Sequence, residues 1–307
     1  MSVAKVAVVV ITYNSADVLP ACLEALRHGG ADGVELTDVV VVDNASTDDS
    51  TDVAAAAEGL PISVVRLTEN VGYAAGLNAG VAALRGRPPE AVMVLNPDCR
   101  VRPGALAVLA KDLRTSGRGI VAPRLVNVDG SLQPSLRRLP TVLGALVEAV
   151  VGGKIADRLG VGELIFSDGP HDTAGPAAWV TGAALLIAWA LLESVGPWDE
   201  RFLLYSEETE FMLRASDHGW STWYEPAAVV EHTGGESGTR PSLAALVTVN
   251  KVALFRRRHG VLRGLAYSGS VLLGTVFRAA AGKRTARASM AALLFPSHRI
   301  HSLAELR

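Results

Sequence analysis

Continuous apolar runs alternate with helix-forming segments through the first hundred residues. The runs are rich in β-branched side chains without polar alternation, which is typical of strands covered on both faces. They occupy residues 6–11, 39–42, 62–67 and 91–95. Helices are predicted after the first three runs, at residues 16–27, 50–58 and 73–84. This alternation predicts an α/β fold with a mostly parallel, Rossmann-like sheet flanked by helices.

The rest of the chain has a different pattern. Residues 118–172 are rich in Gly, Pro and Arg, and we expect them to be less regular. Residues 177–192 form the longest apolar run, predicted to be a buried strand, with strand character at residues 179–186, that leads into a helix. A further helix is predicted at residues 207–218, and the chain is predicted to be helical from residue 243 onward.

Composition describes a folded protein with an uneven charge distribution. Hydrophobic residues make up 49% of the chain and charged residues 20%, which excludes a disordered protein. From residue 251 onward there are eleven Lys or Arg and one acid, Glu305, whereas the remainder has eighteen basic and thirty acidic residues. Two interpretations of the basic tail stay open: contact with an anionic membrane surface, or a solvated helical appendage.

Neither export nor cysteine chemistry is indicated. Cys22 and Cys99 form no CxxC pair, so a disulfide framework or a cysteine zinc site is not expected. An apolar strand begins without a basic leader and a cleavage site, so we expect no signal peptide. The longest apolar run is interrupted by Thr181 and Gly182 and falls short of the roughly 20 residues that a bilayer span needs. The cytoplasm is the expected location.

Polar side chains follow each of the first four predicted strands. They are Thr12-Tyr13-Asn14-Ser15, Asp43-Asn44-Ala45-Ser46-Thr47-Asp48, Glu69-Asn70-Val71-Gly72-Tyr73 and Asn96-Pro97-Asp98. Ligands bind beyond the carboxyl ends of strands in open parallel sheets. Helix capping is the alternative, and it is favoured for Ser15 and Thr47. It accounts less well for Asp43 and Asp98, because two carboxylates at one sheet edge repel each other unless a cation or hydrogen-bond donors separate them.

These motifs resemble those of family 2 glycosyltransferases with the GT-A fold, and most nearly the bacterial rhamnosyltransferase-like members. The similar segments are VVITYNS, VVVDNASTDDS, ENVGYAAGLNAG, VMVLNPD, YSEETEFMLR and VVEHTGG, with support from APRLVNVDGSLQPS, WVTGAALL and VGPWDERF. The resemblance covers residues 6–235. It implies a GT-A domain at residues 1–240, with a nucleotide-binding half at 1–117 and an acceptor-side half at 118–240, followed by a basic helical extension at 241–307.

The resemblance assigns a nucleotide-binding role to the first loops. Thr12, Tyr13 and Asn14 are expected to line the nucleotide pocket, and Asp43 to accept a hydrogen bond from a pyrimidine imide. Asn70 and Gly72 are expected near the ribose or diphosphate, where a missing side chain lets backbone come close.

A divalent cation, Mg²⁺ or Mn²⁺, is the implied cofactor. Asp98 matches the last acid of the family's DxD motif, whereas Asn96, assigned to the nucleotide site, replaces the first acid and leaves one charge fewer. The match also assigns His232 to the metal or the diphosphate, although a lone histidine at a strand end is more often a packing residue. Oxygen ligands and phosphate sharing suit these ions.

The implied general base is Glu208, which stands where the family has Asp. A carboxylate within hydrogen-bond distance of an acceptor hydroxyl can remove its proton during in-line attack. The alternative is that Glu207, Glu208 and Glu210 only complement the dipole at a helix start. Three acids in four residues repel one another, which favours the catalytic interpretation of Glu208.

The acceptor side is assigned more loosely, to Trp179, Gly182, Asp199 and Glu207. Stacking on a sugar and packing in the core are equally compatible with Trp179, whereas packing is favoured for Trp198. The Gly-rich stretch from Thr233 to Arg240 is interpreted as a loop that closes over the donor.

The basic tail is interpreted as helices lying in a membrane interface. This agrees with a lipid-linked or other glycan acceptor and a peripheral position on the inner face of the membrane. Nucleic acid is not an expected partner, because aromatic residues are not interleaved with the basic ones.

The expected activity is inverting sugar transfer from a nucleotide diphosphate, with dTDP-rhamnose as the first donor and UDP-linked galactofuranose as the alternative. A nucleotidyltransferase is disfavoured, since TYNS is not a Gly-rich phosphate loop. A non-catalytic nucleotide-sugar-binding module remains the other alternative, because of Asn96 and the Glu208 replacement.

Overall fold

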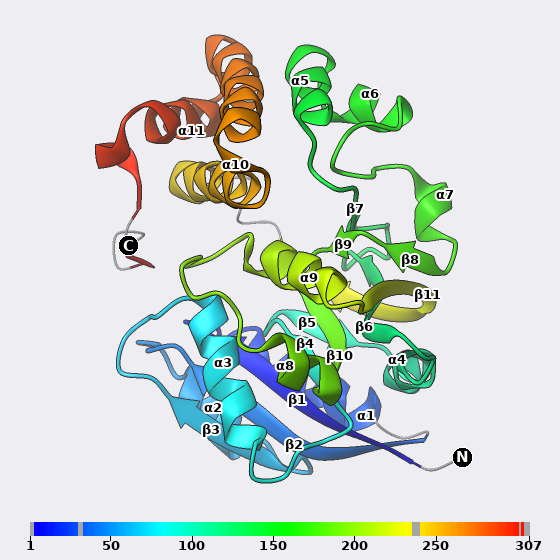
Figure 1. Ribbon diagram of the computed structural model, residues 1–307. Helices are drawn as coiled ribbons and strands as arrows, with labels where there is room; N and C mark the ends of the chain where they lie inside the picture. Colours follow the sequence, from blue (N-terminus) through cyan, green and yellow to red (C-terminus); the bar gives the residue numbers. More distant parts are fainter. Residues whose placement is uncertain (1–2, 30–32, 235–239, 301, 304–307) are drawn as a thin grey trace.

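The computed structural model describes residues 3–29, 33–234, 240–300 and 302–303 (Figure 1). The first part of the chain alternates strands and helices as predicted. Its elements are β1 (Ala4–Thr12), α1 (Leu19–Gly29), β2 (Val34–Asp43), α2 (Ser50–Ala56), β3 (Ile62–Arg66), α3 (Tyr73–Leu84), β4 (Ala91–Leu95), β5 (Cys99–Val101) and α4 (Ala105–Leu113).

The second part contains more regular structure than the sequence predicted. Its elements are β6 (Arg118–Val126), β7 (Leu136–Arg137), α5 (Val142–Val151), α6 (Gly153–Arg158), α7 (Asp168–His171), β8 (Gly175–Ala177), β9 (Trp179–Val180), β10 (Ala184–Ala188), α8 (Trp189–Val195), α9 (Glu207–Asp217), β11 (Ser221–His232), α10 (Pro241–Ala280), α11 (Arg284–Leu294) and a 3₁₀ turn (Pro296–His298).

The strands form one large sheet in the order β3-β2-β1-β4-β10-β6-β11-β5, with β8 beside β11. The first four strands in this order are parallel neighbours, so their carboxyl ends lie at one edge, as expected. β10 runs antiparallel between β4 and β6, and β11 is parallel to β6. A small second sheet pairs β7 with β9.

Both faces of the sheet are buried, which explains the continuous apolar runs. Along β1, Val6, Val8 and Val10 pack under α1 and α4, whereas Ala7, Val9 and Ile11 pack under α3. Successive side chains of a strand point to opposite faces, so a strand between two helical layers needs apolar residues at every position.

Two predictions from the sequence differ from the structure. The Gly-, Pro- and Arg-rich residues 118–172 contain a long strand and α5, which begins where the Thr141 hydroxyl caps the Gly144 N–H at 2.9 Å. The strand character at residues 179–186 is divided between two sheets, because β9 pairs with β7 and β10 enters the large sheet. Gly182 lies in the turn between them.

The C-terminal helices form a layer above the sheet edge, beside α5 (Figure 1). α10 is interrupted at Gly260, whose φ of 79° and ψ of −177° are not helical. By length and composition α10 could cross a membrane, with a mean hydropathy of 1.3 in its most apolar window, of which 33% is buried.

The C-terminal layer is anchored to the rest of the chain through its first helical segment. The Asn250 amide donates to the carbonyl oxygens of Leu204 and Tyr205 at 3.0 and 3.1 Å. Arg257 pairs with Asp199 at 2.7 Å, and Arg258 pairs with Asp217 at 2.9 Å. Two charges of the basic cluster at residues 256–259 are therefore directed at acids of the protein itself.

Helix α3 approaches the sheet closely at Gly80, and this contact gives a testable prediction. A Cβ at Gly80 would lie 2.4 Å from Cγ1 of Val9, whereas a Cβ at Gly86 would meet nothing within 4 Å. We expect Gly80→Ala to lower the free energy of unfolding by about 1–2 kcal/mol, because overpacking outweighs the gain in helix propensity. Gly86→Ala should change it by less than about 0.5 kcal/mol in urea denaturation. Equal effects of the two substitutions would contradict this account of the contact.

Candidate functional site

The loops after β1 and β2 are tied together by Asn14. Its side-chain oxygen accepts hydrogen bonds from the Thr47 N–H at 2.7 Å and the Thr47 hydroxyl at 3.2 Å. Its own N–H donates to the Ser46 hydroxyl at 2.9 Å. Beside it, Thr12 and Asp43 are register partners at the ends of β1 and β2. The structure therefore brings together three of the residues assigned to the nucleotide.

Two of these groups are available to a ligand. The Thr12 hydroxyl is buried and has no hydrogen-bond partner in the described structure. The Asp43 carboxylate accepts only long hydrogen bonds, of 3.2 and 3.3 Å, from the Ser46 N–H. Tyr13 is 36% exposed beside them. Unsatisfied buried polar atoms at a sheet edge are expected where a ligand completes the hydrogen bonding.

Asn44 connects this region to the loop before α3. Its amide donates to the Asn70 side chain at 2.9 Å and to the Gly72 carbonyl at 3.1 Å, and its oxygen accepts from the Val71 N–H at 3.0 Å. Gly72 has a φ of 93°, and a Cβ there would lie 2.3 Å from the carbonyl oxygen of Leu203. The backbone that comes close to Gly72 thus belongs to the loop before α9.

Backbone strain is concentrated in the same loops. Among the described residues, four that are not glycine have positive φ angles: Asn14, Ala45, Tyr205 and Ser206. All four lie in loops that surround the carboxyl edge of the first strands or lead into α9. Residues in sparsely populated conformations tend to cluster at functional sites, where surrounding contacts hold them in place.

Asp98 and His232 form the candidate metal site. Nε2 of His232 lies 3.4 Å from Oδ1 of Asp98, and the Gly234 N–H donates to Oδ2 of Asp98 at 2.9 Å. Nδ1 of His232 lies 2.6 Å from Oε1 of Gln133. Because this oxygen can only accept, Nδ1 carries a proton. Nε2 faces Asp98, and a metal bound between them would take the place of the proton on Nε2.

The chemistry of these donors fits a divalent cation. Burial alone would raise the pKa of Asp98, but the hydrogen bond and charge of His232 and the Gly234 N–H outweigh it, so the pKa is lowered. Cys99 is near enough to be a third ligand, but burial and the charge of Asp98 raise its thiol pKa well above the usual range. Its thiol donates to the Ala183 carbonyl at 3.4 Å. Asp98 and His232 are therefore the two candidate protein ligands, and a diphosphate would complete the shell.

Glu207 and Glu208 open helix α9 with buried carboxylates. One oxygen of each has no hydrogen-bond partner in the described structure. Burial and the charge of Glu208 raise the pKa of Glu207 well above its usual value. Burial also raises the pKa of Glu208, while the charge of Arg137 opposes this shift. A Cβ at Gly182 would lie 3.0 Å from Cβ of Glu208, so glycine leaves room for the stem of this side chain.

Tyr73 is close enough to both the candidate metal site and the candidate base to feel their charges. Its hydroxyl donates to the Asn96 side-chain oxygen at 2.9 Å. Burial raises the pKa of the Tyr73 hydroxyl well above its usual value, and the charges of Glu207, Glu208 and Asp98 add to the shift. The glutamate pair and Asp98, which were predicted from separate motifs, therefore both influence the Tyr73 hydroxyl, as expected if they belong to a single site.

Other sequence-assigned residues have structural partners. Glu210 pairs with Arg214 through two hydrogen bonds of 2.9 Å, which accounts for the third acid of the helix start. Trp179 is 8% exposed and donates to the Arg138 carbonyl at 3.1 Å, and Trp198 stacks on Phe211 with ring centroids 4.1 Å apart. Asp199 pairs with Arg201 and Arg257. Most of the Gly-rich loop interpreted as a donor lid, residues 235–239, lies outside the described residues.

Sequence reasoning missed four residues that the structure places at the site: Asn44, Tyr73, Gln133 and Arg137. Each lies inside or beside a motif, but its partner is between 23 and 99 positions away in the chain. Arg137 donates to the Thr181 hydroxyl at 3.1 Å, and burial lowers its pKa. In the sequence, Arg137 could be recognised only as one of several charged residues in the less regular region 118–172.

Solved structures similar to this one are GT-A glycosyltransferases. A mannosyltransferase from Pyrobaculum calidifontis, in complex with GDP-Man and Mn²⁺, has a TM-score of 0.57 at 21% identity and covers 94% of this chain and 78% of its own. GalNAc-T7 with UDP, GalNAc and Mn²⁺ has a TM-score of 0.60 at 13% identity, covering 81% of this chain and 48% of its own. These likenesses confirm the predicted fold.

Sequence comparisons agree with the fold. An N-acetylglucosaminyl-diphospho-decaprenol L-rhamnosyltransferase of Mycobacterium tuberculosis is 28% identical over 253 residues, which cover 80% of this chain and 81% of the relative. The sequence model of Glycosyl transferase family 2 matches residues 7–166, just over half of the chain. The chain is therefore a member of glycosyl transferase family 2.

Proposed function

We propose that this chain transfers a sugar from a nucleotide diphosphate to an acceptor hydroxyl with inversion at the anomeric carbon. The observation that carries the proposal is the Glu208 side chain, whose carboxylate has an unpartnered buried oxygen and whose Cβ and Cγ lie against Gly182. The same site contains the Asp98 and His232 pair, which suits a metal-bound diphosphate. A base on one side of the anomeric carbon and a leaving group on the other give a single displacement.

Each bond and proton in this reaction has an assigned group. Glu208 accepts the proton of the acceptor hydroxyl while the hydroxyl oxygen forms a bond to the anomeric carbon. The bond from that carbon to the diphosphate oxygen breaks, and its electron pair leaves with the nucleoside diphosphate. Arg137 acts as a positioning residue, because its charge favours the ionised form of Glu208.

Asp98 and His232 would hold the divalent cation, with Gln133 fixing the histidine ring. A cation at this place neutralises the charge that develops on the departing diphosphate. Mn²⁺ in the similar GT-A structures supports this cofactor, and Mg²⁺ meets the same ligand requirements.

The proposed donor is dTDP-rhamnose, and the proposed acceptor is a glycan carried on a lipid diphosphate. The rhamnosyltransferase relative supports both, since its name specifies a rhamnosyl group and a decaprenol diphosphate acceptor. Thr12, Tyr13, Asn14, Asp43, Asn70, Gly72 and Asn96 are the proposed nucleotide contacts, and Trp179, Gly182, Asp199 and Glu207 the proposed acceptor side. A lipid-linked acceptor also favours contact of the basic C-terminal helices with the inner face of the membrane.

The first prediction concerns the reaction itself. We expect nucleoside diphosphate release from dTDP-rhamnose in the presence of Mn²⁺ or Mg²⁺ and crude lipid extract. Glu208→Gln should reduce turnover by about 10²–10⁴-fold and leave donor binding intact, because only the proton acceptor is removed. Asp217→Asn, on the exposed end of the same helix, is the matched control and should keep wild-type turnover.

A panel of dTDP-, UDP- and GDP-sugars identifies the donor in the same assay. Release from a UDP-sugar alone would replace rhamnose with another sugar. Unchanged donor binding and no release from any sugar, in wild type and Glu208→Gln alike, would favour a binding module.

The second prediction is a pH dependence. Turnover requires ionised Glu208, so it should fall on the acid side as the buried carboxyl pair takes up a proton. Arg137→Gln removes the charge that lowers the Glu208 pKa, so the acid limb of the kcat profile should move to higher pH. Arg138→Gln is the control, because Arg138 pairs with Asp157 at 2.9 Å. An acid limb that Arg137→Gln leaves unmoved would contradict this positioning role.

The third prediction tests the metal site through Gln133. Gln133→Leu removes the acceptor that holds the His232 proton on Nδ1, and it should weaken Mn²⁺ affinity by about 10–100-fold in titrations with bound nucleotide. Asp98→Asn should weaken it further, since a charged ligand is lost. Asn127→Ala, which removes a partner of the Gln133 amide and a hydrogen bond to Ser131 but leaves the contact between Gln133 and His232, should have a smaller effect. Metal affinity that is equal in all four proteins would place the cation elsewhere.

A further inference from the structure

Helices α5 and α6 expose apolar side chains that no part of the described structure covers. On α5, Leu143, Leu146 and Val150 follow each other at helical spacing and are 61%, 42% and 63% exposed. Ile155 and Leu159 continue this surface on α6, at 48% and 63%. Apolar side chains grouped in this way on a soluble surface usually mark an interaction site.

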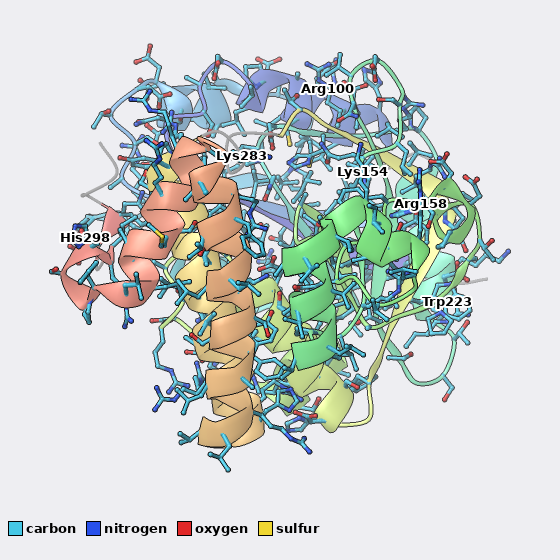
Figure 2. The ribbon with its side chains drawn as sticks, turned by 90° about the horizontal axis from the view of Figure 1, so that it is seen from above. Arg100, Lys154, Arg158, Trp223, Lys283 and His298 are labelled. Carbon is cyan, nitrogen blue, oxygen red and sulfur yellow. The ribbon has the colours of Figure 1, made fainter. Side chains whose placement is uncertain are left out.

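The second segment of α10, residues 261–280, presents a similar stripe. Leu262, Leu265, Val276 and Phe277 are between 40% and 84% exposed. Figure 2, which looks down on this layer, shows this segment side by side with α5. The two helices are in close contact, because a Cβ at Gly274 would lie 3.1 Å from Cα of Ala149. We define the apical layer as α5, α6 and residues 261–280.

Charge is sorted across the apical layer. The acids of its first part point inward: Glu148 accepts from the Glu163 N–H at 2.6 Å, and Asp157 is 6% exposed and pairs with Arg138. Lys154 and Arg158 are exposed on α6 (Figure 2). Residues 261–280 contain no acid but include Arg263 and Arg278, and the adjoining residues 283–299 add Lys283, Arg284, Arg287 and Arg299. The outward charge of the layer is therefore positive.

We propose that the apical layer docks on an anionic lipid bilayer, with α5, α6 and residues 261–280 lying in the interface. Exposed apolar stripes flanked by Lys and Arg are the composition of interfacial helices. This proposal rests on the proposed function, which assigned membrane contact to the C-terminal helices alone. It adds that α5 and α6 make the main apolar contribution to that contact.

Two other arrangements are less consistent with these observations. α10 is broken at Gly260, and its second segment packs against α5 through Tyr267, Val271 and Gly274, so a straight span across the bilayer would separate these contacts. A second copy of the chain would bring two positive surfaces together, which costs free energy unless acids separate them.

The position of the layer suits a lipid-linked acceptor. A cavity of about 640 Å³ at the foot of α5 is lined by Leu139, Leu143 and Val161, and Arg137 lies along it. Arg137 donates to the Thr181 hydroxyl at 3.1 Å, and the next residue, Gly182, lies against the Glu208 side chain. An acceptor anchored in the bilayer would therefore reach the proposed base from the side on which the apical layer docks.

Vesicle flotation of the full chain, without any sugar, tests the docking separately from the transfer reaction. Vesicles of phosphatidylglycerol and phosphatidylcholine should bind the protein, and neutral phosphatidylcholine vesicles or high salt should reduce binding. Leu143→Glu and Leu146→Glu should each weaken binding by at least about tenfold. Each substitution removes a leucine that would enter the bilayer interface and puts a negative charge in its place. Val128→Glu, 61% exposed on the turn after β6, is the matched control and should bind normally.

Charge reversal provides a second comparison. Lys154→Glu with Arg158→Glu should weaken binding by about tenfold or more, whereas Arg85→Glu with Arg87→Glu, at the end of α3, should not. All substituted side chains are exposed, and thermal unfolding should confirm that each variant folds.

Three outcomes would overturn the proposal. Wild-type protein that ignores anionic vesicles at low salt would exclude bilayer docking. Binding that Leu143→Glu, Leu146→Glu and the combined Lys154→Glu and Arg158→Glu variant all retain at wild-type strength would exclude α5 and α6 as its source. A wild-type dimer that Leu143→Glu converts to a monomer, without vesicle binding, would assign the layer to self-association. None of these results depends on sugar transfer, so the proposed function can fail or hold independently.

Discussion

Two adjacent carboxylates buried at the start of α9 are the constraint on which the rest of the site depends. Withdrawing Glu207 and Glu208 from water raises the pKa of both, and one oxygen of each lacks a partner. Such an arrangement is unfavourable unless the surrounding structure holds it, which the core does here through Phe211 and Met212 on the following turn. Three further features act on the start of α9. They are the strained backbone of Tyr205 and Ser206, the space left by Gly182 and the charge of Arg137. The site is thus built at a cost in stability, as is common where groups must remain reactive.

Much of the fold was accessible from the sequence because the pattern that specifies it is local. The strands in the middle of the sheet are buried on both faces, so their apolar runs could be identified without knowledge of their neighbours. Helix α5 was missed for the opposite reason. Its apolar residues face α10 on one side and solvent on the other, so it lacks the polar face that marks an ordinary surface helix.

The candidate site was accessible only in part. Asp98, His232 and Glu208 were found through motifs, but the residues that orient them come from distant segments. Gln133 contacts His232 across 99 positions, and Arg137 acts on Glu208 from the short strand β7. Such pairs depend on the antiparallel return of β10 and on β11 beside β6, and no local pattern encodes that topology. The charge of the tail was similarly ambiguous, since Arg257 and Arg258 look free in the sequence but pair with Asp199 and Asp217.

The contact between Gly72 and Leu203 joins the loop after β3 to the loop before α9. The loop that contains Gly72 also accepts the Asn44 amide, and the Leu203 carbonyl accepts the Tyr73 N–H at 2.9 Å just ahead of the strained turn into α9. Even a methyl group at position 72 would push this turn away and move Glu208 with it. The two loops must therefore change together during evolution, because the loop after β3 can vary only within the shapes that the loop before α9 tolerates.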